Sequence, residues 1–413
     1  MTLSYTKLMG AAATLALIAG PALGQESINQ PVVIDQVQLG QTISDLNVVV
    51  IDQTFDAIAA STAVGNTAAG ELLRGNLDYD AIQTNSGETS AANTVTGGLV
   101  SGTLTSSTTA YGNASTSGTE LGDIYNYANQ TTSGDTAADS DISLNGAENI
   151  AASTTAAANV SASQGAFGQN SSFQEQASNG SVQATSNASL FNINESGAFT
   201  TTASGNVASS SAQTSTSING AVQTTSAGQT ISSSTDIFAL DGNDVSTTTT
   251  ASGNSFVLQN EYGFASLGRE GSQLYQENNA SENADATITL ENWSGNANAS
   301  AYGVGNSALV SNFGSDTSLY ALQNNSGNIS STASLTGDSN SNGTGAASAT
   351  SIGNAASGFL CNTCGDSILR GTVTQRNNGN TSASTTVNAT SSGSIIGTAT
   401  AIGNAATFTS SGS

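Results

Sequence analysis

A long internal repeat constrains this chain more than any other feature. A glutamine recurs at eight places, and each is followed 28 to 30 residues later by a Gly-Asn pair, once replaced by Ala158-Asn159. Successive pairs begin 46 to 52 residues apart. Such a period indicates an array in which each unit packs on its neighbours. The glutamines are Gln36, Gln83, Gln130, Gln176, Gln223, Gln276, Gln323 and Gln375, and the remaining pairs are Gly65-Asn66, Gly112-Asn113, Gly205-Asn206, Gly253-Asn254, Gly305-Asn306, Gly353-Asn354 and Gly403-Asn404.

Each unit also carries a half-repeat. A glycine follows most of the glutamines by four residues, as Gly40 follows Gln36, and together with the Gly-Asn pairs these positions lie 22 to 27 residues apart. The segments between them alternate like strands, for example Ala286–Leu290. We therefore expect an all-β fold, a parallel β-solenoid of about sixteen rungs in eight doublets, about 75 Å long. Its corners would be glycines with positive φ, and its amides would form ladders.

The N-terminus predicts export. Residues 1–24 read as a signal peptide, with Lys7 as the positive charge, an apolar stretch from Leu8 to Gly20 and small residues before Gln25. We expect residues 25–60 to form the first rungs or a cap, because they are the most apolar part of the remaining chain, and residues 61–413 to form the repeat solenoid. A secreted location at the cell surface follows from the leader.

The charge balance excludes several classes of function. Cleavage of the leader removes the lysine and leaves four arginines against 29 acidic residues, a net charge of 4 − 29 = −25, with no histidine. Such a surface repels nucleic acid and anionic headgroups. Without His or Lys, the common catalytic bases and Schiff-base formers are lacking, so we expect no enzyme and no cofactor or metal site.

The two cysteines are close in sequence. Cys361 and Cys364 flank Asn362-Thr363, and in an exported protein this spacing favours a local disulfide over a zinc or redox site. The segment from the Gly353 pair to Gln375 is 22 residues long where most units have 18, so we expect the bond to close a loop insertion.

Two stretches carry a family resemblance. Ser318–Asn328 and Tyr302–Val310 resemble curlin repeats, and the whole chain, through its leader, doublet repeat, acidic composition and Ala401–Ala406 ending, resembles the holdfast anchor protein HfaD family. The resemblance implies an exported, outer-membrane-associated protein that ties an adhesive polysaccharide to the cell, beside a curlin-like subunit and a curli-secretin-like lipoprotein. The second half of each doublet departs from curlin by placing Thr109, Ala301, Ala349 or Ala399 near the Gln position.

The residues themselves predict a structural surface protein, an adhesin or anchor that binds a polysaccharide through many weak contacts along a repeating face and joins other subunits at its ends. Two alternatives stay open. One is a curlin-like amyloid fibre subunit, and the other is a β-solenoid enzyme acting on polysaccharide through Asp139 and Asp141, near Asp135.

Two smaller sequence patterns bear on ligand binding. Trp293, with Tyr302 and Tyr320, would make a stacking platform for sugar rings, although packing against the solenoid is favoured. Asp338–Gly343 matches the first half of an EF-hand loop, but Ala349 stands where the bidentate glutamate belongs, so a plain turn is expected.

Overall fold

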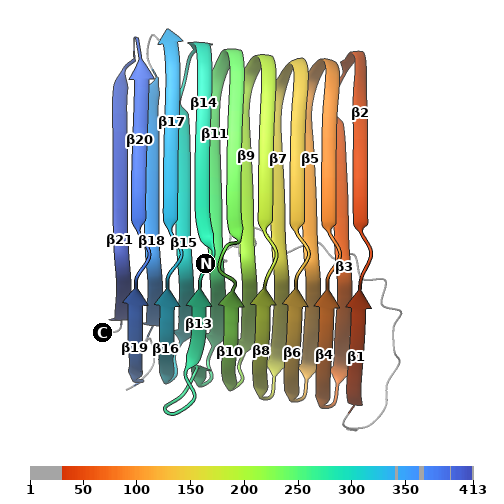
Figure 1. The fold of residues 1–413 in the computed structure, drawn as a ribbon, viewed down its shortest axis with the longest axis vertical. Coiled ribbons are helices and arrows are strands. Elements are labelled where there is room, and N and C mark those ends of the chain that lie inside the picture. Colours follow the sequence, from red (N-terminus) through yellow and green to blue (C-terminus); the bar gives the residue numbers. More distant parts are fainter. Residues whose placement is uncertain (1–29, 340–342, 362–366, 391, 412–413) are drawn as a thin grey trace.

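The computed structural model describes residues 30–339, 343–361, 367–390 and 392–411 (Figure 1). Each regular element in these ranges is a β-strand, and the paired strands run parallel. They form one sheet of nine strands and one of twelve. The predicted parallel β-solenoid is confirmed.

The nine-stranded sheet contains the glutamine-bearing strands. Most of them are nine residues long, and the sixth is divided in two. The strands are β1 (Gln30–Gln38), β4 (Leu77–Asn85), β6 (Ile124–Thr132), β8 (Asn170–Ser178), β10 (Ser217–Thr225), β12 (Ala265–Leu267), β13 (Leu274–Asn278), β16 (Thr317–Asn325) and β19 (Leu369–Asn377).

The twelve-stranded sheet contains the longer strands. In four coils a single strand of 32 or 33 residues bends over, and in the others it is divided at the bend. The strands are β2 (Thr42–Thr54), β3 (Ala57–Arg74), β5 (Thr89–Leu121), β7 (Thr136–Phe167), β9 (Val182–Gln213), β11 (Thr230–Glu261), β14 (Ser281–Trp293), β15 (Ala297–Phe313), β17 (Ile329–Ser339), β18 (Thr344–Cys361), β20 (Thr381–Ala389) and β21 (Ser394–Ser411).

One coil is a flattened loop with a front and a back. In the first coil, β1 continues through a short corner into β2, and the chain then reverses and returns through the 18 residues of β3 (Figure 1). The returning strand lies behind both front strands, since Ser61 of β3 bonds Ser44 of β2 while Thr67 accepts a hydrogen bond from Gln36 of β1. The next coil, β4 and β5, repeats this path.

One coil corresponds to a full repeat. Gln36 pairs with Gln83, and Asn66 with Asn113, each one repeat further along the chain. The described residues therefore form eight coils, and the prediction of sixteen rungs of about 24 residues is wrong. Seven spacings of about 4.8 Å give a stack about 34 Å deep instead of 75 Å. The longest dimension runs along the strands, where the 18-residue β3 spans about 60 Å.

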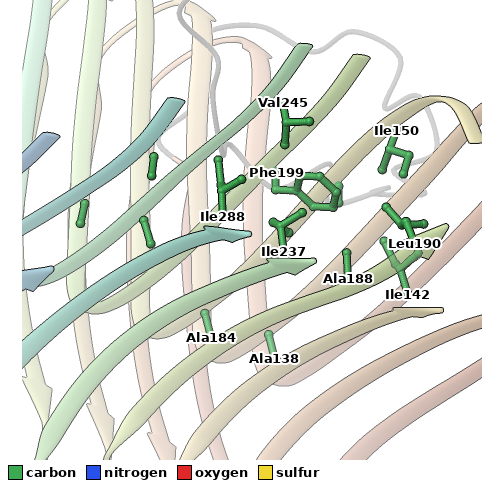
Figure 2. Close-up of a cluster of buried hydrophobic side chains, with 14 of the residues drawn as sticks. Ala138, Ile142, Ile150, Ala184, Ala188, Leu190, Phe199, Ile237, Val245 and Ile288 are labelled. Carbon is green, nitrogen blue, oxygen red and sulfur yellow. The ribbon is translucent and has the colours of Figure 1, made fainter. Parts of the chain in front are cut away.

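The core between the front strands and the returning strands has a polar band at the middle of the coil. Apolar side chains fill the core on both sides of this band along the strand direction. Like residues stack on one another in successive coils, as Ala138 does on Ala184 and Ile237 on Ile288 (Figure 2). Phe199 enters this layer from the returning half of β9 and is buried with them. Alternation explains the pattern, because every second side chain of a strand faces inward and the front and back strands bury these positions against each other.

Candidate functional site

The eight repeat glutamines form one continuous ladder through the polar middle. Each amide nitrogen from Gln83 onward donates to the amide oxygen of the glutamine in the preceding coil, at 2.7–2.9 Å. The second N–H donates to a carbonyl of the returning strand, as Gln130 does to Val160 at 2.9 Å. The inner glutamines are buried, and both N–H groups of each have a partner, so the cost of burying these amides is offset.

The asparagines of the Gly-Asn pairs form a second ladder, on the returning strands. Asn66 donates to Asn113 at 2.8 Å and Asn113 to Asn159 at 2.9 Å, and the series continues to Asn404. These bonds point toward the C-terminal coil, whereas those of the glutamine ladder point toward the N-terminal coil. Each asparagine before the last also donates to a front-strand carbonyl of the next coil, as Asn113 does to Thr131.

The Gly-Asn glycines are not turn residues with positive φ. They lie within strands, and their φ values are outside the left-handed region. A Cβ on Gly112 would lie 2.6 Å from the carbonyl oxygen of Ala158 in the next coil. Glycine is therefore required here by the close approach of adjacent coils, and the expectation of a left-handed turn is wrong.

One expected corner, Gly228 after the front strand β10, does adopt a left-handed backbone, with φ 81°. The left-handed corners that close most coils were not predicted from the sequence. They follow the returning strand, for example at Gly122 and Gly168, and in two coils the position is occupied by Thr214 (φ 53°) and Tyr262 (φ 58°). Because the residue type differs from coil to coil, the sequence offers no repeated signal for this corner.

The outer faces present rows of hydroxyl, amide and carboxylate groups. Along β9 the outward side chains are Gln183, Thr185, Asn187 and Ser189, while the residues between them are buried. Neighbouring coils link these groups, as Asn187 donates to Asp141 at 2.8 Å. The faces of the inner coils are thus ordered in register and polar, whereas coil 1 also exposes apolar side chains such as Val33, Ile43 and Ile58.

One part of the nine-stranded sheet adds aromatic rings to this surface. Tyr127 and Phe173, paired in adjacent coils, stack with centroids 6.3 Å apart and planes 1° from parallel. The Tyr127 hydroxyl donates to Glu175 at 2.7 Å, and Asn129 donates to the same oxygen. Burial and the Glu175 carboxylate raise the pKa of Tyr127. Tyr125 lies on the same outward face, at 45% exposure. We call Tyr125, Tyr127, Phe173 and Glu175 the aromatic patch.

The three aspartates considered for catalysis are placed at the surface. Asp135 accepts a hydrogen bond from the Ser181 backbone at a corner, and Asp139 and Asp141 face outward on β7. Burial raises the pKa of Asp139, a hydrogen bond from Thr185 lowers it in part, and the charge of Asp141 adds to the rise. The carboxylates therefore bond to groups of the next coil.

Trp293 does not form a platform with the two tyrosines. Its ring is 4% exposed and belongs to the core, which agrees with the packing interpretation. A Cβ on Gly337 would lie 2.5 Å from the indole nitrogen, so glycine makes room for the ring. Tyr302 lies on the returning strand β15 and Tyr320 on the front strand β16, which belong to opposite sides of the coil.

Several predicted features fall outside the described residues. These are the leader, Asn340–Asn342 of the EF-hand-like stretch, and Cys364, so the Cys361–Cys364 disulfide stays a prediction; Cys361 ends β18. Across the described ranges, no group of three His, Cys, Asp or Glu side chains is placed to hold a metal ion. The same part of the chain contains no helix long and apolar enough to span a membrane.

Comparison with known proteins gives a family match. The family described as holdfast attachment protein D matches residues 51–328, from within β2 to the corner before β17. No curated protein and no solved structure matches the chain. The matched region covers more than half of the sequence and contains Gln83–Gln323 of the glutamine ladder, Asn66–Asn306 of the asparagine ladder, and the aromatic patch. The chain therefore belongs to the HfaD, or holdfast attachment protein D, family, whose members serve in holdfast attachment at the cell surface.

Proposed function

We propose that the chain anchors an adhesive polysaccharide to the cell envelope through many weak contacts on its outer faces. The family supports a role in holdfast attachment and an association with holdfast polysaccharide. The observation that carries the finer proposal is the outward row of polar side chains on the inner coils, joined in coils 3 and 4 by the aromatic patch.

The chemistry of these faces suits a sugar polymer. Hydroxyl and amide side chains exchange hydrogen bonds with sugar hydroxyls, and aromatic rings pack against the apolar face of a sugar ring. Binding sites linked on one polymer act together, so contacts that are weak singly give strong attachment in sum. The net charge of −24 favours a neutral or cationic polymer over an anionic one.

The location and partners are proposed from the same resemblance. The protein would be exported, associated with the outer membrane, and assembled beside a curlin-like subunit and a curli-secretin-like lipoprotein. Deletion of the gene for either partner should leave the protein synthesised but absent from the cell surface. Surface labelling of intact cells measures this, and unchanged labelling would contradict the proposed partnership.

The binding test targets the aromatic patch. We expect the double variant Tyr127→Ala/Phe173→Ala to bind purified holdfast polysaccharide at least about tenfold more weakly, because each ring contributes on the order of 1 kcal/mol or more. Phe191→Ala is the matched control, since this ring is 57% exposed and lies on the longer strand β9, away from the patch. Equal binding by the double variant and the control would contradict the assignment of the patch.

The amyloid alternative has one observation in its favour. Continuous Gln and Asn ladders are typical of cross-β stacks. A curlin-like subunit would seed fibrillation from unfolded chain, whereas an anchor folds into a unit of eight coils without seeding. The enzyme alternative predicts cleavage of the polysaccharide that is lost in Asp139→Asn; we expect no cleavage by either form.

A further inference from the structure

We propose that chains of this protein stack head to tail, the C-terminal coil of one copy against the N-terminal coil of the next, to form a filament. Coil 1 is β1, β2 and β3, and coil 8 is β19, β20 and β21. This inference goes beyond polysaccharide binding and does not depend on it.

The two end coils match in length in two of their three strands, while β2 has 13 residues and β20 has nine. Their front strands β1 and β19 are both nine residues long, and their returning strands β3 and β21 are both 18 residues long. Each coil has a partner on one side only among the described residues, so each leaves one edge of backbone N–H and C=O groups unpaired. Such edges template the addition of another strand, and parallel strands of equal length can pair along their whole length.

The amide ladders end in complementary groups. In the described part of the chain, Gln375 receives no hydrogen bond at its amide oxygen and Asn404 donates none from its amide nitrogen. At the other end, and again among the described residues, Gln36 donates only to Thr67 and the Asn66 amide oxygen accepts no hydrogen bond. Stacking joins Gln36 of the next copy to Gln375, and Asn404 to Asn66 of the next copy, with the direction of both ladders unbroken.

The second N–H of Asn404 also finds an acceptor in this register. Asn66 and Asn113 each donate to the residue that follows the glutamine in the next coil. The equivalent residue of coil 1 is Val37, whose carbonyl would accept the bond from the preceding copy.

Gly40 gives independent support at the N-terminal end. Its equivalents Gly87 and Gly134 have to be glycine, because a Cβ there would overlap the backbone carbonyl of the preceding coil. Among the described residues no coil precedes that of Gly40. A Cβ there would meet no described atom within 4 Å, and its φ is outside the left-handed region. The carbonyl of Gly379 in a preceding copy supplies the missing reason for glycine.

Gly403 gives the corresponding support at the C-terminal end. The equivalent glycines, such as Gly305 and Gly353, are blocked by the carbonyl of the following coil at 2.5–2.6 Å. A Cβ on Gly403 would meet only Asn377, at an ordinary 3.4 Å. Glycine is thus retained at both ends where only an additional coil requires it.

The charges of the end coils are opposite. Residues 30–74 contain five acidic residues and Arg74, a net charge of 1 − 5 = −4, whereas residues 369–411 contain two arginines and no acidic residue, a net charge of +2. Unlike ends attract and like ends repel, so this distribution favours head-to-tail contact and speeds it at low salt. A contact between different surfaces does not close on itself and therefore extends into a filament.

The test uses single substitutions that block one end each. In Gly40→Ala the N-terminal end is blocked and in Gly403→Ala the C-terminal end, while neither Cβ meets an obstacle among the described residues of its own chain. The purified full chain should form filaments with a repeat of about 4.8 Å along the axis. Each variant alone should sediment as a monomer. An equimolar mixture should give dimers, because one free end of each kind remains.

The control is Gly118→Ala on the outward face of β5, where a Cβ lies at an ordinary 3.8 Å from its nearest neighbour. This variant should form filaments as the unchanged chain does. Circular dichroism checks that all variants keep their strand content. A monomeric unchanged chain, filaments formed by Gly40→Ala alone, or a mixture that stays monomeric would each overturn the proposal.

Discussion

Replacing Gln223 with leucine tests the glutamine ladder where it is fully enclosed. The amide of Gln223 donates to Gln176 at 2.8 Å and to the Ser255 carbonyl at 2.9 Å, and accepts from Gln276 at 2.7 Å. Leucine fills similar space but leaves the Gln176 oxygen and one Gln276 N–H buried without partners. Each such group costs about 1–3 kcal/mol, so we expect a loss of about 2–6 kcal/mol in the free energy of unfolding.

The same change at the end of the ladder is the control. In the single chain Gln36 is only partly buried, and water can replace its partners, so Gln36→Leu should cost about 1 kcal/mol or less when both variants are made in the monomeric Gly40→Ala chain. Urea unfolding followed by circular dichroism measures both, and hydrogen exchange in coils 4 to 6 reports the local loss in Gln223→Leu. Equal losses of unfolding free energy at the two positions would refute the reasoning that burial is what makes the ladder hydrogen bonds important for stability.

Three further predictions follow from buried groups. Burial raises the pKa of the Glu282 carboxyl well above its ordinary value, and a hydrogen bond from Asn278 offsets this only in part. The folded chain therefore holds the Glu282 proton more tightly than the unfolded chain does. The stability gained from this proton is present below about pH 4 and is lost as the pH rises through the raised pKa. Glu282→Gln should remove that loss and stabilise the chain at pH 7, which thermal unfolding at a series of pH values measures. Gly134→Ala places a Cβ against the Gly87 carbonyl and should lower the free energy of unfolding in urea by about 1–3 kcal/mol or more. The control Gly118→Ala should keep a free energy of unfolding close to that of the unchanged chain. Trp293→Ala should lower the free energy of unfolding by about 3–5 kcal/mol and remove the tryptophan fluorescence of the folded chain. An unchanged midpoint of urea unfolding would contradict the place of Trp293 in the core.

The period of the repeat could be predicted from the sequence because the ladders need identical residues. A buried amide is stabilised by another amide at the same height in the next coil, so Gln36, Gln83 and Gln130 keep their spacing. The number of residues in a coil was misjudged for a physical reason. The front strand and the returning strand of one coil each pass through the polar middle of the core once. Each passage has an amide side chain and a nearby glycine, so the Gln/Gly and Gly-Asn patterns both occur within a single coil.

The position of single side chains was harder to predict. Whether a residue faces in or out depends on the phase of alternation, and a register shift at the bend changes that phase, as it does between Ala147 and Asn149. The aromatic patch was missed because Tyr127 and Phe173 come together only when coils stack one full repeat apart. Twenty-four-residue rungs would separate them.

The distance between two outward residues at the ends of the stack tests the account most directly. Ile58 in coil 1 and Ile396 in coil 8 belong to one column of paired residues that passes through every coil, and both are exposed. Spin labels at these positions, in a chain with both cysteines replaced by serine and diluted with unlabelled chain, give the distance by pulsed electron paramagnetic resonance. One full repeat per coil predicts about 34 Å, whereas a distance of about 67 Å would contradict it and restore the half-repeat rung.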